Sequence, residues 1–396
     1  MAHNSYPGAI LCETALSPNS PPVDAEKACT NLCAFHRLES SKEPYFVKEV
    51  LRDVHKQMKE RKAGEVITIK TLDGLLVDFK VRTGEILDIS EGVAWIAGKT
   101  YIEYVPIHTL ASNEAHGPYL GYCNLLIIHR LRFRAVRSGE YLHEPVLPPF
   151  EACLAEFFSF RQVWEASDTH KQIRATLEAL PAIATPITKI IGFACNSLAN
   201  PQGCMREKQR VAFQHALLLT LKDHLDTKTG NPDIKILVQD PAYTEADIAM
   251  LTHLGMTVVE DPVGFVEVDE QSFVFACSPT VPARQIVMDM AMPAGMVWNK
   301  VLAEAVIFDV SDPWNLSVHR CINRYYDTHA LPEDRKHFAL MALYVRRVEG
   351  EVSAEVYAIR DLEVLITVRN YGQYADQMRL KAETMYELLC KVDRFE

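Results

Sequence analysis

The stretch from Thr188 to Asn299 decides the fold, because short apolar runs in it repeatedly end in small or polar residues. The sequence KIIGFA (189–194) leads into CNS (195–197), IKILVQ (234–239) into DPAY (240–243), MTVVE (256–260) into DP (261–262), and SFVFA (272–276) into CSP (277–279). Apolar runs of this length, separated by helical segments, are typical of buried parallel strands. We therefore expect an α/β fold with a mostly parallel sheet.

The ends of these runs form the predicted site. In open α/β sheets, ligands bind outside the carboxyl ends of the strands. Side chains that can take part in chemistry stand at these ends, namely Cys195, Asn196, Ser197, Asp240, Tyr243, Asp261, Cys277 and Ser278. We expect them to lie around one crevice.

Four segments are predicted along the chain. Residues 1–43 contain several prolines and are expected to form a flexible or irregular arm. Residues 44–149 are expected to form a helix and then a strand-rich region, residues 150–300 the core domain, and residues 301–396 a mixed extension that ends in a helix. The apolar stripe from Met378 to Val392 on that last helix favours core packing or a homodimer contact over a cofactor site.

The composition limits the possible locations. At 396 residues, the chain is long enough for two or three domains, or for one large domain with extensions. No apolar run approaches the roughly 20 residues that span a bilayer. The N-terminus also lacks a signal-peptide pattern, so neither membrane insertion nor secretion is expected. The ten cysteines are scattered, which favours reduced thiols in a cytoplasmic protein.

The formal net charge of −11 argues against broad, nonspecific binding of nucleic acid. A local basic face remains, because Arg130, Arg132 and Arg134 alternate along a predicted strand and share one side of it. These arginines are candidates for nucleic-acid contact. The alternative is a solvated edge strand, on which charge prevents unwanted pairing.

Standard catalytic signatures are absent from the sequence. It contains no Walker loop, no G-x-G-x-x-G, no G-x-S-x-G elbow and no H-E-x-x-H. Fourteen histidines are present, but none form a pair with clear metal-ligand spacing. We therefore predict no cofactor and no metal site.

Several short motifs of the central block point to a known family. They are GFA (192–194), FQHAL (213–217), QDPAY (239–243), DPVGF (261–265), CSP (277–279), VPARQI (281–286) and Trp298. With these motifs the chain resembles the sensitivity-to-red-light-reduced family, most closely its fungal-type branch, over about residues 185–300. The resemblance implies a Rossmann-like domain. Members have been linked to light and clock signalling and to haem metabolism. Many members have a Gly-x-Gly-Ser-like first loop, whereas this chain has ACNS (194–197).

The predicted catalytic group consists of Cys195, Ser197, Asp240 and Tyr243. Asp240 ends the second strand, where nucleotide-binding Rossmann folds bind ribose hydroxyls. The alternative is an Asp-Pro turn. Cys195 and Ser197 precede the first helix, whose N-terminus lowers the pKa of a thiol and stabilises anions. The alternative is an inert, buried cysteine.

Further residues are predicted to bind substrate, namely Asn196, His215, Asp261, Cys277, Ser278 and Trp298. His215 lies in a predicted helix among apolar neighbours, which favours a core histidine over a catalytic base. Tyr243 and Trp298 either line a pocket or pack in the core.

Two functions from different classes are compatible with these residues. The first is an acyl- or aminoacyl-transfer enzyme of secondary metabolism. Gly192 to Ser197 is weakly similar to the nucleophile loop of cyclodipeptide synthases, which have a Rossmann-like fold and use aminoacyl-tRNA. Ser197 or Cys195 then takes the acyl group. Asp240 or Tyr243 orients the amine, and the arginine face meets the tRNA. The second is a non-catalytic regulator that binds a metabolite or partner, as in light, clock or haem-linked regulation.

Overall fold

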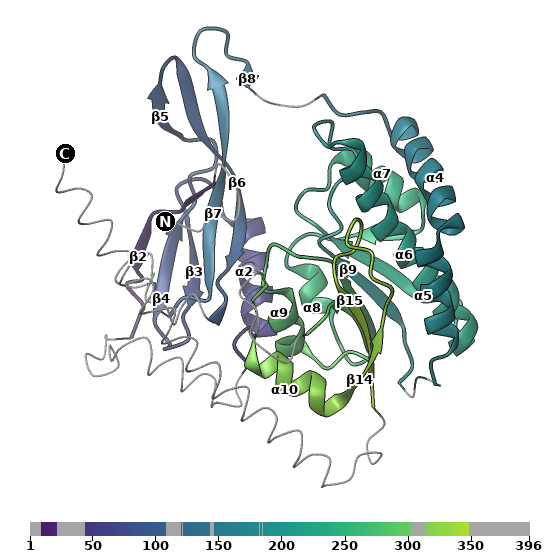
Figure 1. The fold of residues 1–396 in the computed structure, drawn as a ribbon. Coiled ribbons are helices and arrows are strands. Elements are labelled where there is room, and N and C mark those ends of the chain that lie inside the picture. The colour runs from purple at the N-terminus through teal and green to yellow at the C-terminus, as the bar shows by residue number, and fades with distance from the viewer. Residues whose placement is uncertain are drawn as a thin grey trace, which may run out of the picture.

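The computed structural model of the chain describes residues 9–21, 44–107, 120, 122–142, 146–181, 183, 185–301, 312–313 and 315–347. These residues form three sheets with helices packed around them (Figure 1). The expected mixed α/β fold is therefore confirmed. Within these ranges no helix is both long enough and apolar enough to cross a membrane.

The N-terminal part contains two antiparallel sheets. One has the order β1 (Ala9–Leu11), β7 (Leu125–Ala135), β6 (Val93–Tyr104), β5 (Ile86–Ser90), and β8 (Tyr141–Leu142) pairs with β7. The other has the order β2 (Thr14–Leu16), β4 (Leu76–Lys80), β3 (Val66–Lys70).

Residues 9–16 thus differ from the irregular arm that we expected for residues 1–43. Pairing of β1 with β7 and of β2 with β4 orders this segment. These partners lie more than a hundred and about sixty residues away in the sequence. A local reading of prolines could not reveal them. The rest of the predicted arm, apart from residues 17–21, lies outside the described residues.

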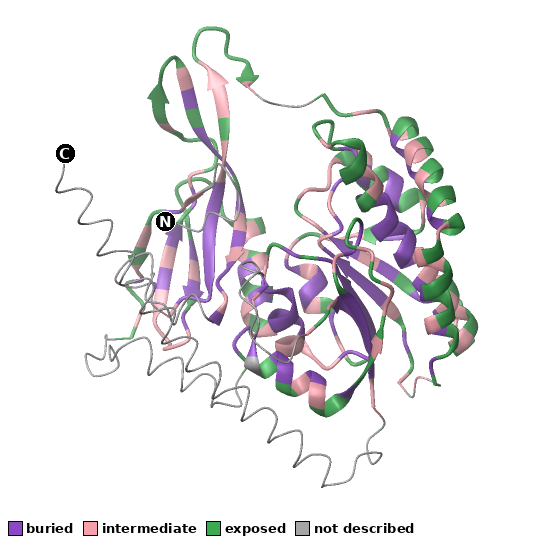
Figure 2. Cartoon of the chain, viewed as in Figure 1, coloured by how far each residue is buried: buried purple, intermediate pink, exposed green. Residues whose placement is uncertain are grey.

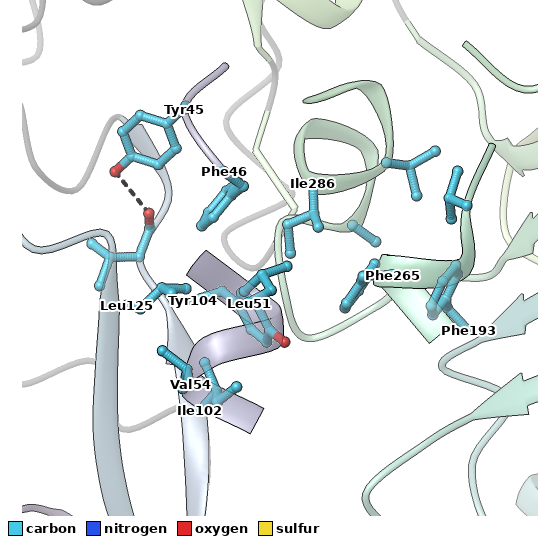
Figure 3. Packing of buried hydrophobic residues seen from close by; sticks show 14 of the residues in the cluster. Tyr45, Phe46, Leu51, Val54, Ile102, Tyr104, Leu125, Phe193, Phe265 and Ile286 are labelled. Carbon is cyan, nitrogen blue, oxygen red and sulfur yellow. Dashed lines mark hydrogen bonds between the residues drawn. The ribbon is translucent and has the colours of Figure 1, made fainter. Parts of the chain in front are cut away.

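The helix α2 (Lys48–Glu60) joins the N-terminal part to the rest of the molecule. Its side chains Leu51 and Val54, three residues apart, are both buried on one face. Figure 3 shows them in one cluster with Tyr104 of β6 and with Phe193 and Phe265 from the central part. The two parts therefore share a hydrophobic core.

The central sheet has the strand order β11 (Met256–Val258), β10 (Lys235–Gln239), β9 (Lys189–Phe193), β12 (Ser272–Ala276), β13 (Gly295–Asn299), β15 (Met341–Arg346), β14 (Tyr326–Ala330). The first five strands pair in parallel. β15 is antiparallel to both of its neighbours, so β14 runs in the same direction as β13. The strand order reverses at β9, which lies between β10 and β12.

Helices cover both faces of this sheet. On one face lie α4 (Phe150–Ala166), α5 (Asp168–Glu178), α6 (Met205–Thr229) and α7 (Glu245–His253), whose apolar side chains pack with Ile190 of β9. On the other lie α8 (Val263–Glu267), α9 (Ala283–Met290) and α10 (Leu316–Tyr325), which pack with Ile191. The inner strands β9, β10, β12, β13 and β15 are correspondingly buried along most of their length (Figure 2), whereas the edge strands β11 and β14 are more exposed. Gly192 permits close packing of α6, because a Cβ there would lie 2.9 Å from Leu218 Cδ1.

Residues beyond 300 belong to the same sheet. The core domain was predicted to end at residue 300, but β14 and β15 extend the sheet to Arg346. The apolar stripe from Met378 to Val392, and with it the predicted final helix and homodimer contact, lies outside the described residues. A homodimer therefore stays a prediction.

Candidate functional site

A pocket with a volume of about 390 Å³ lies at the carboxyl edge of the central sheet. Its wall comes from the ends of β9, β10 and β12, from α6 and α8, from β6 of the N-terminal part, and from the loop between β14 and β15. Predicted site residues that line it are Asn196, Asp240, Asp261, Cys277 and Ser278. Cys195, Ser197, His215, Tyr243, Trp298 and the three arginines do not line it.

The loop after β9 has an unusual backbone. Ala194 has a φ of 57° and Asn196 a φ of 62°, both in the left-handed region that most residues avoid. The Asn196 side chain supports the turn, because its Oδ1 accepts a hydrogen bond from the backbone N–H of Ser197 at 2.7 Å. The turn directs Cys195 into the core and leaves Ala194 and Asn196 in the pocket wall.

Asp240 is held at the end of β10 by backbone amides. Its Oδ2 accepts a hydrogen bond from Asn196 N at 2.7 Å, and its Oδ1 accepts one from Ala242 N at 2.9 Å. Burial raises the pKa of Asp240, while these two hydrogen bonds and the charge of Arg130 lower it. The side chain remains partly exposed. The structure is therefore compatible with both alternatives for Asp240. Its carboxylate stabilises the Asp-Pro turn, and the residue also lines the pocket, where it can bind a ligand.

A second carboxylate, Asp261, connects the two parts of the molecule. Its Oδ1 accepts hydrogen bonds from the hydroxyl of Tyr104 at 2.6 Å and from Gln239 Nε2 at 2.9 Å. Gln239 Oε1 in turn accepts a hydrogen bond from Gly264 N at 2.7 Å. Burial raises the pKa of Asp261 to about 7, although both hydrogen bonds lower it. This carboxyl group can therefore change its charge near neutral pH.

Cys277 and Ser278 follow β12. The thiol of Cys277 contacts the carbonyl oxygen of Phe338 at 3.4 Å, and burial raises its pKa to about 12. Ser278 is exposed and has a φ of 48°. Its N–H donates to Asn299 Oδ1 at 2.7 Å. Cys277 is therefore a neutral part of the pocket wall.

Ser197 belongs to a buried structural network. Its hydroxyl donates to Asp247 Oδ2 at 2.6 Å. Asp247 is 1% exposed and also accepts hydrogen bonds from the backbone N–H groups of Leu198, Ala199 and Thr244 and from the Thr244 hydroxyl. This network fixes the loop after β9 to the capping box that begins α7.

Cys195, His215 and Tyr243 also do not line the pocket; the first two are buried and Tyr243 is partly buried. Cys195 is fully buried, and burial raises the pKa of its thiol, opposite to the lowering that we expected from a helix N-terminus. His215 Nδ1 donates to the Val211 carbonyl at 2.8 Å, and its Nε2 accepts from the Tyr243 hydroxyl at 2.9 Å. Burial lowers the pKa of His215 to about 4. His215 is thus a core histidine, the alternative that its neighbours favoured.

The remaining predicted residues lie elsewhere. Trp298 is 1% exposed and packs against Tyr344. Arg130, Arg132 and Arg134 lie on β7 as expected, but β7 pairs with strands on both sides and is not an edge strand. The guanidinium groups of Arg130 and Arg132 stack over Tyr101 and Tyr141, at 4.9 and 3.8 Å from the ring centroids.

Several pocket residues were missed in the sequence. Tyr104 belongs to no motif, and Gln239 belongs to the QDPAY motif (239–243) but was not among the predicted site residues. The pair Asp334 and His337 has an i, i+3 spacing but lies beyond the predicted core domain. His337 Nδ1 lies 2.8 Å from Asp334 Oδ2, and His337 lines the pocket. The i, i+3 spacing in DRKH (334–337) was the one available signal, and it is weak without the fold.

A larger cavity, of about 580 Å³, lies between α4, α5 and α6, away from the strand ends. None of the predicted site residues lines it. The described ranges also contain no group of three or more His, Cys, Asp or Glu side chains arranged to hold a metal ion. The pocket at the sheet edge is therefore the stronger candidate site.

Residues 173–303 match the model of the SRR1 domain. This part of the chain is therefore an SRR1 domain, and the family resemblance is confirmed. The match begins in α5 and ends just after β13, so β6 and the Asp334–His337 loop fall outside it. The similarity to the fungal-type branch and to cyclodipeptide synthases stays a prediction.

Curated proteins gave no match to this chain. Among solved structures, one match is the "MycE Methyltransferase from the Mycinamycin Biosynthetic Pathway in Complex with Mg, SAH, and Mycinamycin VI". The match has 9% sequence identity, covers 83% of this chain and 93% of that chain, and has a TM-score of 0.29. So distant a likeness identifies neither the fold nor a function.

Proposed function

We propose that the pocket binds a small molecule with vicinal hydroxyl groups, such as the ribose of a nucleoside. The observation that carries this proposal is the carboxylate of Asp240, which lies in the pocket wall with each oxygen held by one backbone N–H group. A carboxylate has about four lone-pair sites. Acceptor sites therefore remain for hydroxyl donors of a ligand.

The place of Asp240 in the sheet supports the same ligand class. We interpret the five parallel strands as a Rossmann-like sheet, whose order reverses between β10 and β12 on either side of β9. In such sheets ligands bind in the crevice at the reversal, and an acidic residue of the second strand accepts hydrogen bonds from ribose hydroxyls. Asp240 directly follows β10, the second strand of this unit.

The rest of the wall suits a nucleoside. Tyr101, Tyr104, Phe193 and Phe265 give it an aromatic side, and the rings of Phe193 and Phe265 stack with centroids 4.3 Å apart. Aromatic faces pack favourably against planar rings such as nucleobases. The volume of about 390 Å³ lies within the range of about 300–1,000 Å³ for small-molecule sites.

Acyl or aminoacyl transfer stays a prediction. An aminoacyl-tRNA ends in a nucleoside and so belongs to the proposed ligand class. The predicted nucleophiles give little support to covalent transfer, because Cys195 and Ser197 are buried outside the pocket wall. The regulatory alternative requires binding of the same ligand class without turnover.

Isothermal titration calorimetry with adenosine, AMP and NAD⁺ tests the proposal. We expect at least one of them to bind the wild-type chain. Asp240→Asn should then weaken binding by about tenfold to hundredfold, because hydrogen bonds to charged groups contribute about 1.5–3 kcal/mol. Deoxyadenosine, which lacks one ribose hydroxyl, should bind more weakly than adenosine to the wild type and nearly equally to the variant.

Glu245→Gln is the matched control. Glu245 is exposed near the same loop and does not line the pocket, so this variant removes a similar charge without touching the site. Its affinity should equal that of the wild type. If no nucleoside binds, or if both variants bind as tightly as the wild type, the proposed function is wrong.

We also propose a cytoplasmic location. The cysteines in the described ranges are free thiols, and most are buried. Free thiols are typical of a reducing compartment.

A further inference from the structure

His337 lies in the pocket wall with one ring nitrogen unused. The residue is 8% exposed, and its Nε2 has no hydrogen-bond partner among the described residues. Of the buried polar atoms that lack a partner in this part of the chain, Nε2 of His337 is the one that belongs to the pocket wall. Buried polar groups in proteins are nearly always paired with protein, water or ligand. His337 lines the pocket, so a ligand group is one partner that this buried nitrogen can take.

The other ring nitrogen is held by Asp334. His337 Nδ1 lies 2.8 Å from Asp334 Oδ2 and 3.0 Å from Oδ1. Because a carboxylate only accepts hydrogen bonds, Nδ1 carries the proton in this pair. In the neutral ring Nε2 is then a lone-pair acceptor, and Asp334 stabilises the ring if it becomes positively charged.

Further contacts fix the orientation of the pair. The Thr169 hydroxyl donates to Asp334 Oδ2 at 3.1 Å. Gln214 Nε2 donates to the His337 carbonyl at 3.3 Å, and the His337 ring packs on Phe213 with centroids 4.4 Å apart. Helices α5 and α6 thus hold the loop between β14 and β15, the last two strands in the order of the central sheet.

We propose that His337 is the proton-accepting group of this pocket and that Asp334 is its positioning residue. Nε2 accepts a hydrogen bond from a hydroxyl or amine of the bound ligand. In a reaction it takes that proton: the O–H or N–H bond breaks, its electron pair stays on the ligand atom, and a new N–H bond forms at Nε2. The ligand atom becomes a stronger nucleophile, which is the role of a general base.

His337, on the loop between β14 and β15, and Asp240, directly after β10, both line the pocket. The inference that they share a ligand rests on the proposed function. The charged or titratable groups near His337 are Asp334, which contacts its ring without lining the pocket, and three residues of the wall, Arg335, Arg210 on α6 and Cys277 after β12. Tyr101, Tyr104, Asp240 and Asp261 are the remaining titratable groups of the wall.

The first experiment does not depend on any ligand. Diethyl pyrocarbonate modifies the unprotonated imidazole, and peptide mass spectrometry reports each histidine separately. His215 is the internal comparator, since Tyr243 occupies its Nε2. The hydrogen bond that His215 must first give up slows its modification by about tenfold relative to His337.

Two variants separate positioning from general structure. Asp334→Asn should slow modification of His337 severalfold, because the amide no longer stabilises the developing positive charge. Thr169→Ala removes another contact of Asp334 but leaves the bond to His337, so its rate should match the wild type. Equal rates in all three proteins, or a His337 that is as unreactive as His215, would overturn the proposal.

The second experiment couples His337 to the ligand. His337→Asn places an amide N–H near the position of Nδ1 and removes Nε2, so the contact with Asp334 has a replacement. Adenosine should protect wild-type His337 from modification. It should bind this variant about tenfold more weakly.

The two proposals fail in different ways. If no nucleoside binds, the proposed function is wrong, while the reactivity of His337 and its dependence on Asp334 still test the base. If adenosine binds through Asp240 but neither protects His337 nor distinguishes His337→Asn, the inference about His337 is overturned.

Discussion

Two polar clusters lie at the same edge of the central sheet. They differ in how many of their hydrogen-bond acceptor sites are already occupied by donors of the protein. Asp247 accepts hydrogen bonds from Ser197, Leu198, Ala199 and Thr244 and is 1% exposed. In the pocket, Asp240 is partly exposed, and Nε2 of His337 has no partner among the described residues. The first cluster holds two loops together, whereas the second retains capacity for a ligand.

The comparison shows that residue type alone does not separate structural from functional groups. Ser197 follows a predicted strand in the manner of a nucleophile, but the structure makes it a donor to Asp247. A group can act on a ligand only if its hydrogen-bonding capacity is not already used within the protein. Variants in the two clusters should accordingly affect different quantities, stability in one and binding in the other.

The largest expected effect is that of Asp247→Ala on stability. The change leaves several buried N–H and O–H donors without an acceptor, which should lower the free energy of unfolding by more than about 3 kcal/mol. Urea denaturation monitored by circular dichroism measures this loss. Glu245→Gln in the same helix should change stability by less than about 0.5 kcal/mol. A similarly small loss for Asp247→Ala would show that the network does not hold the loop.

Asp261 should make stability depend on pH. Its pKa is raised from 3.8 to about 7 in the folded state, so between these values the folded chain binds more protons than the unfolded chain. The free energy of unfolding should therefore fall as pH rises from about 4 to 7, by at most about 1.4 kcal/mol per pH unit from this group. Denaturation midpoints at several pH values measure the slope.

Asp261→Asn is the comparison for this slope. Asn keeps an oxygen that can accept from Tyr104 and Gln239 but does not titrate. The slope should become smaller without vanishing, because burial also raises the pKa of Asp289 to about 7. If the slope of the free energy of unfolding against pH did not change, a group other than Asp261 would cause the pH dependence.

Tyr243→Phe should have a smaller effect on stability. It removes the hydroxyl that donates to His215 Nε2 and leaves that buried nitrogen without a protein donor. The expected loss is about 1–2 kcal/mol in urea denaturation. Because neither residue lines the pocket, adenosine affinity should stay at the wild-type value. If Tyr243→Phe clearly lost affinity for adenosine while keeping wild-type stability, Tyr243 would have to contribute to the binding site.

The smallest effect is expected for Cys195→Ala. The thiol is buried in the hydrophobic core and carries no charge at neutral pH, because burial raises its pKa. We expect a loss of about 1 kcal/mol or less and unchanged binding. Iodoacetamide should label the exposed Cys204 and leave Cys195 unlabelled in the native protein. Rapid labelling of Cys195 would contradict this expectation and would support its predicted role as a nucleophile.

Much of the fold could be read from local patterns. The four apolar runs in the opening stretch coincide with β9, β10, β11 and β12. The capping box at the start of α7 likewise joins Thr244 to Asp247, only three residues further on. These features depend on residues close in the sequence. The pairing of β1 and β2 and the addition of β14 and β15 to the central sheet depend on distant partners, and the sequence patterns missed them.

The sequence by itself determined which side chains stand at the strand ends, because a parallel sheet brings those ends to one edge. The tertiary structure decided which of them face the pocket. The left-handed turn at Ala194 and Asn196 directs Cys195 inward, and the buried carboxylate of Asp247 engages Ser197. The loop between β14 and β15 adds His337 to the wall. The physical reason is that orientation and hydrogen-bond saturation depend on contacts between segments far apart in the chain.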